Sequence, residues 1–319
     1  MDVHERLRER LYERPLVECI PNFSEGRDEA RIDKIVDAVQ SVAGVHVLDH
    51  SSDADHNRTV FTFIGEPEPV AEAAFQSIKQ AAELINLDHH TGQHPRIGAA
   101  DVVPFVPLRN ASMAQCVQMA EQLGQRVGDE LGLPVYLYEH AARVPTRVNL
   151  AEVRRFPYEI LKTSIQSDPS RRPDFGPSRL GPAGAVAIGA RGPLIAFNAY
   201  LATDDIGVAQ AIARTVRESG GGLTYLKALG LLVSGQAQVS MNVIDYRQTG
   251  LHLILETVRA EASKHGTVVT HTELVGLVPR MALIDAALAY LGLPQDAGKL
   301  TLETRIGLVT GDFRDLPFE

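Results

Sequence analysis

Histidine is the residue type whose distribution first points to chemistry in this sequence. Six of the eleven histidines lie in one stretch of the chain, at positions 46, 50, 56, 89, 90 and 94. Imidazole titrates near neutral pH, so a histidine held in a constrained loop can accept and return a proton during a reaction. We therefore expect a site in or near residues 46–94.

His94 is the strongest candidate within the segment HHTGQHPRIGAAD. Pro95 restricts the backbone conformation of His94. Gly92 and Gly98 permit a turn that would place Arg96 beside the imidazole. A neutral imidazole fixed in this way can act as a general base near pH 7. The alternative is that one or more of these histidines only bonds a backbone carbonyl.

The same histidines could bind a metal, but their spacing argues against it. The sequence contains no HExxH motif and no cysteine pair near them, which are common features of zinc sites. The adjacent His89 and His90 could still ligate a metal from a loop. A metal-dependent amidohydrolase therefore stays open as a second hypothesis, while the spacing favours a site without a metal.

A second polar loop, HSSDADHNR, precedes the strand predicted over residues 59–64. Its acidic residues Asp53 and Asp55 are spaced as in a calcium loop, but the glutamate that completes an EF-hand is absent. The loop is either a solvated turn or a segment whose Asn57 and Arg58 orient a substrate.

Several common mechanisms lack their motifs in this sequence. Neither GxGxxG between a strand and a helix nor GxxxxGK[ST] occurs, which argues against nucleotide-dependent chemistry. No GxSxG motif occurs, and neither Cys19 nor Cys116 lies in a nucleophile motif, which argues against an acyl-enzyme.

The composition is typical of a soluble globular protein. Of the 319 residues, 45% are hydrophobic and 22% are charged, and 31 basic against 40 acidic residues give a net charge of −9. This balance argues against nucleic acid as a partner, and no apolar run of about 18 residues is present to cross a membrane. Two cysteines, and a charged opening without an apolar signal segment, predict a cytoplasmic location.

Short and long apolar patterns alternate along the chain and predict an α/β (α+β) fold. In the first half we expect strands at 16–20, 45–49, 59–64, 101–108 and 133–139, and helices at 27–43, 67–86 and 112–131. Their β-α-β-β-α-β order is ferredoxin-like. The second half repeats this theme more loosely, with strands at 185–190 and 193–201 expected to pair with each other. We therefore predict two ferredoxin-like α/β subdomains.

Residues 166–184, rich in proline and glycine, mark the expected boundary, because neither helix nor strand can persist there. By composition this stretch is a linker. Alternatively, its three arginines around an aromatic ring suit an anionic or planar ligand. We expect an N-terminal extension over 1–15 and subdomains over 16–180 and 181–319.

Seven longer segments carry more specific patterns: LVECIPNFSEGRD, DADHNRTVFTFIGEPEPVAEAAF, HHTGQHPRIGAADVVPFVPL, PVYLYEHAA, RPDFGPS, AQVSMNVIDY and ELVGLVPRMALIDAA. With these segments, in this order, the chain resembles the glutamate formimidoyltransferase family over residues 16–287. The resemblance covers most of the chain.

The resemblance implies transfer of the formimino group from N-formimino-L-glutamate to tetrahydrofolate, which gives 5-formiminotetrahydrofolate and L-glutamate in histidine degradation. It also implies a homodimer, and subdomains whose β-sheets face each other with the substrates between them. Tetrahydrofolate is the expected co-substrate and no metal is expected. Animal members of the family continue into a cyclodeaminase domain, so we expect a separate cyclodeaminase for the next step.

The resemblance further implies which residues form the site. His94 corresponds to the catalytic histidine of the family and would act as general acid and base. Asn57, Arg58 and Arg96 are candidates to orient the substrates, which carry several negative charges. The folate-binding segment corresponds to Gly176, Pro177, Ser178, Arg179, Leu180, Gly181, Pro182, Ala183 and Gly184.

Two alternatives remain beside the metal-dependent amidohydrolase. The first is a related one-carbon transfer that uses a formyl group, as with formylglutamate or 5-formyltetrahydrofolate, because the donor differs by one small group. The second is a binding protein that stores folate or responds to it without catalysing transfer.

Overall fold

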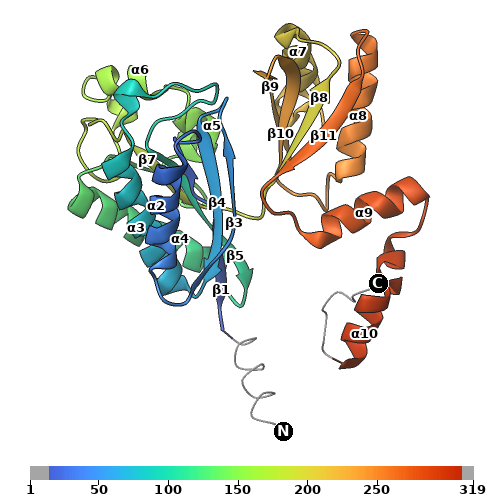
Figure 1. Cartoon of the computed structure of the whole chain (residues 1–319), viewed down its shortest axis with the longest axis horizontal. Helices are drawn as coiled ribbons and strands as arrows, with labels where there is room; N and C mark the ends of the chain where they lie inside the picture. The colour runs from blue at the N-terminus through green and yellow to red at the C-terminus, as the bar shows by residue number, and fades with distance from the viewer. Residues whose placement is uncertain (1–13, 311–319) are drawn as a thin grey trace. The chain divides into compact units, whose positions relative to one another are not determined.

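The pattern predicted for the first half of the chain is present in the computed structural model, which describes residues 14–310 (Figure 1). The first 13 residues of the N-terminal extension expected over 1–15 lie outside the described residues. The strands up to residue 193 are β1 (Leu16–Cys19), β2 (Asn22–Phe23), β3 (Val45–Asp53), β4 (Arg58–Gly65), β5 (Ala100–Arg109), β6 (Val135–Glu139) and β7 (Val186–Ala190). The helices are α2 (Glu29–Gln40), α3 (Pro67–Leu84), α4 (Met113–Arg126), α5 (Leu150–Val153) and α6 (Tyr158–Ser164).

Local sequence signals define where the longer helices begin. The Asp28 side chain caps α2 by accepting a hydrogen bond from the backbone N–H of Arg31 at 3.2 Å. Ser112 caps α4 in the same way, with the N–H of Gln115 at 3.1 Å. Pro67 opens α3, where a missing N–H costs no helical hydrogen bond. These starts agree closely with the predicted ones.

The first sheet contains a ferredoxin-like core. β1 and β2 lie at its centre, antiparallel to β4 on one side and to β5 on the other, and β3 pairs with the far edge of β4. The order β3–β4–β1–β5 follows from two interleaved β-α-β units. β7 and then β6 extend the sheet beyond β5 through parallel pairs.

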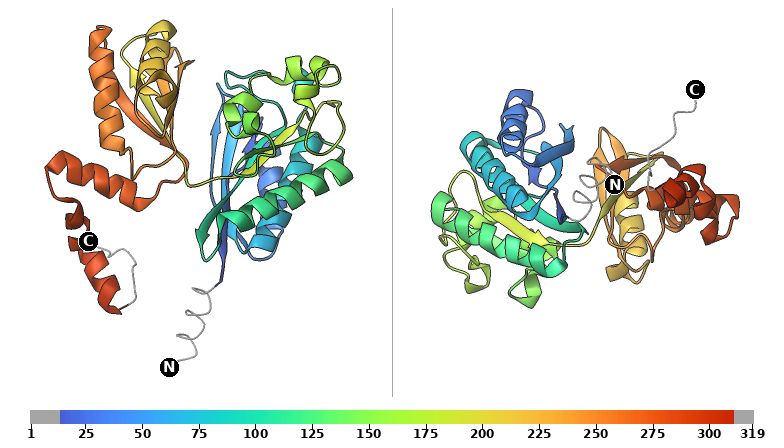
Figure 2. Two further views of the ribbon diagram at one scale, coloured as in Figure 1. Left: turned by 180° about the vertical axis from the view of Figure 1, so that it is seen from behind. Right: turned by 90° about the horizontal axis from the view of Figure 1, so that it is seen from below.

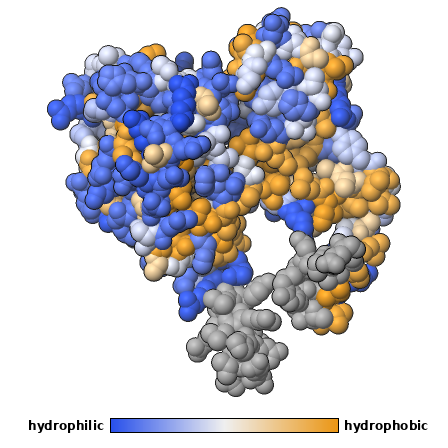
Figure 3. Space-filling model, viewed as in Figure 1, coloured by the Kyte–Doolittle hydropathy of each residue, from blue (hydrophilic) through white to orange (hydrophobic). Residues whose placement is uncertain are grey.

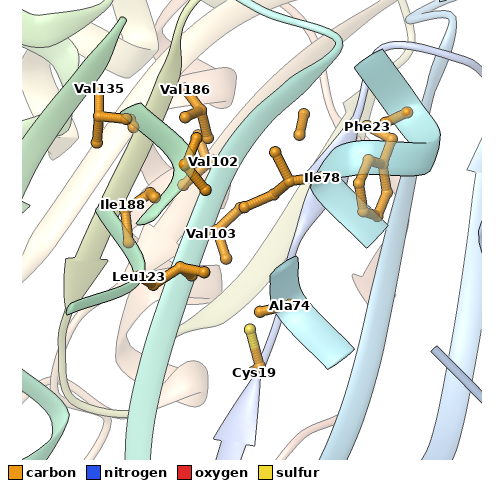
Figure 4. Packing of buried hydrophobic residues seen from close by; sticks show 14 of the residues in the cluster. Cys19, Phe23, Ala74, Ile78, Val102, Val103, Leu123, Val135, Val186 and Ile188 are labelled. Atoms are coloured by element: carbon orange, nitrogen blue, oxygen red, sulfur yellow. The ribbon is translucent and has the colours of Figure 1, made fainter. Parts of the chain in front are cut away.

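The helices α2, α3 and α4 lie side by side over one face of this sheet (Figure 2). Figure 4 shows how the two layers meet: Ala74 and Ile78 of α3 and Leu123 of α4 approach Cys19 of β1 and Val103 of β5. All of these side chains are buried. Removal of such apolar surface from water is the main force that holds the layers together.

The second unit repeats the same order with four strands. It contains the strands β8 (Ile195–Leu201), β9 (Leu226–Val233), β10 (Gln236–Val243) and β11 (Val269–Val275), and the helices α7 (Ile206–Val216), α8 (Leu251–Lys264), α9 (Arg280–Leu291) and α10 (Leu302–Thr310). The sheet order is β11–β8–β10–β9, with all neighbours antiparallel. The prediction of two ferredoxin-like α/β subdomains is confirmed. Within residues 14–310, no helix is both long and apolar enough to cross a membrane.

The predicted pairing of strands 185–190 and 193–201 is wrong. β7 pairs with β5 and β6 in the first sheet, whereas β8 pairs with β10 and β11 in the second. Within the described residues, the first unit ends at Pro193 and the second begins at Leu194. The division follows residue 193 rather than residue 180 because β7 is an interior strand of the first sheet.

The proline-rich stretch 166–184 packs onto the first unit instead of joining two units as a linker. The Asp174 carboxylate accepts the backbone N–H of Leu137 at 2.8 Å and pairs with Arg147 at 2.7 Å. Near its other end, the carbonyl oxygen of Ala183 accepts the N–H of Ala99 at 2.8 Å. Tertiary hydrogen bonds therefore order a segment whose composition favours neither helix nor strand.

Gly98 generates a prediction about this contact, because a Cβ added there would lie 1.7 Å from the carbonyl oxygen of Ala185. Backbone cannot yield as a flexible side chain can, so Gly98→Ala should lower the free energy of unfolding by about 1–3 kcal/mol. Gly192→Ala is the matched control, since a Cβ at that position meets nothing within 4 Å. Urea denaturation followed by circular dichroism measures both variants, and equal stability would contradict the close approach.

Candidate active site

His94 lies in residues 85–99 between α3 and β5, a segment that we call the histidine loop and that contains the 3₁₀ turn Leu87–His89. The side chain of His94 is partly buried. Its Nδ1 atom is 2.7 Å from the carbonyl oxygen of Pro95. Because a carbonyl oxygen can only accept a hydrogen bond, Nδ1 carries the proton in this contact. The lone pair of Nε2 is then available to accept a proton from another molecule.

A buried carboxylate near this loop holds two arginines from different parts of the chain. Asp101, in β5, has no solvent exposure and accepts hydrogen bonds from Arg58 at 2.8 Å and from Arg154 at 2.6 Å. Its other oxygen accepts the backbone N–H of Ile97 at 2.8 Å. Arg58 begins β4, and Arg154 directly follows α5. Asp101 therefore ties together two strands, the histidine loop and the end of a helix.

The charges in this cluster stabilise one another. Burial by itself would raise the pKa of the Asp101 carboxyl, but Arg154, Arg58 and the Ile97 N–H lower that pKa to about 2. Burial lowers the pKa of Arg58 to about 10, against the attraction of Asp101. At neutral pH the cluster therefore holds two positive charges and one negative charge.

These charges act on His94. Burial, followed by the positive charges of Arg58 and Arg154, lowers the pKa of His94 well below its usual value of 6.5, and the attraction of Asp101 opposes this only in part. The ring of His56 meets the His94 ring edge to face, with 5.9 Å between the centroids. His94 is neutral at pH 7, which is the form that can accept a proton.

Arg96 holds the shape of the loop through its guanidinium group. Its Nε donates to Nδ1 of His90 at 2.8 Å, so the His90 proton resides on Nε2, which donates to the carbonyl oxygen of Asn57 at 3.0 Å. Two further N–H groups of Arg96 bind the carboxylate of Glu159 in α6 at 2.7 and 3.2 Å. The structure thus engages Arg96 with His90 and Glu159 rather than with His94. A role for Arg96 toward a substrate stays a prediction.

Asn57 lies in the turn between β3 and β4 and links the histidine loop to the loop that contains Gly26. Its φ of +48° is a conformation that asparagine adopts more readily than most residues. Its side chain donates to the carbonyl oxygen of Thr91 at 3.0 Å and accepts the N–H of Gly26 at 2.9 Å. Asn57 also borders a surface hollow of about 610 Å³, whose other lining residues are Glu25, Arg27, Asp28, Glu29 and Arg31.

The predicted folate-binding segment, Gly176 to Gly184, lies against the histidine loop. The backbone N–H of Leu87 donates to the carbonyl oxygen of Pro182 at 2.8 Å. Within the segment, residues 176–179 are exposed and Leu180 is buried. The exposed part leaves backbone amides and one arginine accessible to a ligand.

Sequence reasoning missed Arg154, which the structure places in the charged cluster. Arg154 and Asp101 are 53 residues apart in the chain, and the segment LAEVRRF around Arg154 carries no motif. The doubled arginine is its sole local signal, and many exposed helix ends share that signal. No spacing rule connects residues so distant in the sequence.

The histidines of this loop do not assemble a metal centre in the described structure. Within residues 14–310, no group of three or more histidine, cysteine, aspartate or glutamate side chains is arranged to hold a metal ion. Both ring nitrogens of His90 have partners, Arg96 on one side and Asn57 on the other.

Asp101→Asn tests the central interaction, because it keeps the shape of the side chain and removes the charge that two arginines share. The variant should lose about 3–5 kcal/mol of unfolding free energy at pH 7, since two guanidinium groups then lack their counter-charge. Asp168→Asn is the control, because Asp168 is half-exposed in its pair with Arg171, and it should cost much less because solvent screens an exposed pair.

The pH dependence of the unfolding free energy gives an independent check on the role of the Asp101 charge. The folded-state pKa of Asp101, about 2, lies below that of an unfolded aspartate, about 3.9. Its stabilising contribution is therefore complete above about pH 4 and is lost as the pH falls toward about 2. Urea denaturation at pH 7 and at pH 3 should show that part of the acid sensitivity of the wild type disappears in Asp101→Asn. An unchanged acid sensitivity would contradict the assignment.

Comparison with known proteins places both units in one family. Residues 16–191 match the family model for the formiminotransferase domain, N-terminal subdomain, and residues 196–310 match that for the formiminotransferase domain. A glutamate formimidoyltransferase from Thermoplasma acidophilum is 49% identical over 282 residues, which cover 87% of this chain and 93% of the relative.

A glutamate formimidoyltransferase from Streptococcus pyogenes serotype M1 is 44% identical over 295 residues, 91% of this chain and 98% of the relative. The formimidoyltransferase-cyclodeaminase of Sus scrofa is 43% identical over 92% of this chain, which corresponds to 57% of that longer protein. The chain therefore belongs to the formiminotransferase domain family.

Proposed function

We propose that this protein is a glutamate formimidoyltransferase, which transfers the formimino group of N-formimino-L-glutamate to N5 of tetrahydrofolate. The products are 5-formiminotetrahydrofolate and L-glutamate. Membership of the formiminotransferase family and the likeness to relatives that carry this name support the activity. The observation that carries the proposal for the site is a neutral His94 whose Nε2 can accept a proton.

The reaction requires one proton to change places. N5 of tetrahydrofolate attacks the formimino carbon, and a new C–N bond forms while the attacking nitrogen becomes positively charged. Nε2 of His94 takes the proton from N5. The bond between the formimino carbon and the glutamate nitrogen then breaks, and His94 returns the proton to that nitrogen. One histidine can serve as base and then as acid because the proton that it accepts is the one that the leaving group needs.

Positioning supplies the remainder of the rate enhancement, because two separate molecules must meet at one atom. Asn57 and Arg96 contribute by fixing the loop that carries His94, through their contacts with Thr91 and Glu159. Arg58 contributes a buried positive charge near the imidazole. Both substrates are anionic, so a locally positive site suits them despite the overall negative charge of the chain.

We propose that the segment Gly176 to Gly184 binds tetrahydrofolate. Three observations support this assignment: residues 176–179 are exposed, the segment contacts the loop of His94 through Leu87, and it carries the exposed Arg179. A guanidinium group can form two parallel hydrogen bonds with a carboxylate of the folate tail.

We further propose a cytoplasmic homodimer that works without a metal in histidine degradation. Two buried free cysteines, Cys19 and Cys116, suit a reducing compartment. Apolar side chains of α9, among them Met281, Leu283 and Tyr290, are exposed in this chain (Figure 3). A second copy of the chain would remove such a surface from water.

His94→Ala tests the assigned role directly. The variant loses the proton acceptor, so the rate of transfer should fall by about 10²- to 10⁴-fold, while the affinity for tetrahydrofolate changes little. Steady-state kinetics and fluorescence titration with tetrahydrofolate measure the two effects. His89→Ala is the matched control, because His89 is an exposed histidine of the same loop. Wild-type turnover in His94→Ala would overturn the assignment.

Metal removal separates this enzyme from a metal-dependent amidohydrolase. After dialysis against a strong chelator, we expect full transfer activity, because the proton transfers above involve only protein and substrate groups. Elemental analysis of the dialysed protein provides the control for complete removal. Loss of activity that zinc or another divalent metal restores would contradict a metal-independent mechanism.

A further inference from the structure

The cluster around Asp101 carries one more positive charge than negative charge. Arg58 and Arg154 are both cationic, and Asp101 is the one carboxylate within salt-bridge distance of either in the described part of the chain. The side chains of Arg58 and Arg154 are only 8% and 15% exposed. A buried charge without a counter-charge is costly, so this excess suits a site that an anion completes.

The two arginines differ in how their donors are used. Arg58 donates to Asp101 through Nη1 and to the Asn22 side chain through Nε and Nη2 at 3.1 and 2.9 Å. Arg154 donates to Asp101 through Nη2, and its buried Nε has no hydrogen-bond partner among the described residues. Since buried N–H groups almost always have partners, the Nε of Arg154 is the donor that a ligand would satisfy.

The chemistry of the donor substrate identifies which anion fits. During transfer, His94 exchanges a proton with the nitrogen of glutamate, and the α-carboxylate is attached to the carbon next to that nitrogen. The carboxylates of a folate tail lie on the far side of an aromatic ring from N5. Asp101, which holds Arg154 at 2.6 Å, also accepts the backbone N–H of Ile97, three residues after His94, so Arg154 lies beside the loop that carries the base and can meet an anion there.

We propose that Arg154 binds the α-carboxylate of the donor, an N-formimino amino dicarboxylate, and thereby selects donors that carry this group. The inference rests on the proposed function and adds a residue to its substrate site. A guanidinium fork matches a carboxylate geometrically, and Asp101 already holds one side of the fork in place. Arg154 is thus oriented by the protein before the substrate arrives.

The bound carboxylate has a second consequence for His94. The charged groups that act on this imidazole are Arg58 from β4, Asp101 from β5 and Arg154 after α5, and the ring packed edge to face against it is His56 from the β3–β4 turn. A substrate anion at Arg154 offsets part of the positive charge that disfavours the imidazolium. Proton transfer to His94 therefore becomes easier when the donor is in place.

The experiment compares two donors in three variants at saturating tetrahydrofolate. The donors are N-formimino-L-glutamate and 4-(formimino)aminobutyrate, which keeps the side-chain carboxylate and lacks the α-carboxylate. The variants are Arg154→Gln, Arg154→Lys and, as matched control, Arg155→Gln, whose side chain is exposed and pairs with Glu152. Circular dichroism and thermal unfolding verify that each variant is folded.

For Arg154→Gln we expect kcat/KM for formiminoglutamate to fall by about 10- to 100-fold, the usual effect of losing a hydrogen bond between charged groups. With the wild type, kcat/KM for the aminobutyrate donor should be lower than kcat/KM for formiminoglutamate by a similar factor. Arg154→Gln should lower kcat/KM for the aminobutyrate donor little further. Arg154→Lys keeps a charge beside Asp101 but loses the fork, so its activity should be intermediate. KM for tetrahydrofolate, measured in a separate series at a saturating donor concentration, should stay unchanged, and Arg155→Gln should resemble the wild type.

Other outcomes would overturn the proposal. An equal loss on both donors would make Arg154 a purely structural residue, and a raised KM for tetrahydrofolate alone would assign it to the folate. Calorimetric titration with formiminoglutamate separates the inference from the proposed function. If the wild type binds the donor more tightly than Arg154→Gln does but transfers nothing, the proposed function is wrong and the carboxylate site is supported. If both proteins bind the donor equally tightly, the carboxylate site is wrong.

Discussion

The carboxylate of Asp101 is the interaction on which the site depends. It is fully buried and accepts hydrogen bonds from Arg58, Arg154 and the N–H of Ile97. Without these partners a buried carboxylate would take up a proton, and without the carboxylate the two buried guanidinium groups would repel each other. Each charge thus lowers the free-energy cost of burying the others. Together the charges fix the relative positions of β4, β5, the histidine loop and the end of α5.

This arrangement determines the protonation state of His94 and also which of its ring nitrogens keeps a free lone pair. Burial and the excess positive charge keep the ring neutral, and the contact with Pro95 places the proton on Nδ1. A general base needs both properties, because the lone pair must be present and must be on the accessible nitrogen. The same two cations make this region locally positive, although the net charge of the chain is −9.

The two units share one strand order, and the histidine loop belongs to the first. That unit differs by the additional strands β7 and β6, which bring the segment before β7 against the loop before β5. Gly98 and Gly184 form an isolated bridge between these two segments. A side chain at either glycine would collide with the opposite backbone, so the close approach requires residues without a Cβ.

The sequence by itself determined the helix starts and the ferredoxin-like order, because caps, periodicity and turn residues act over a few positions. It also singled out His94 as the candidate base, because the family segments are long. Only the tertiary structure decided that Arg154 shares Asp101, that Arg96 turns to Glu159, and that β7 joins the first sheet. From the sequence, any arginine could reach any carboxylate and any two apolar strands could pair. Which of them meet is decided by long-range strand pairing and burial, to which residues far apart in the chain contribute together.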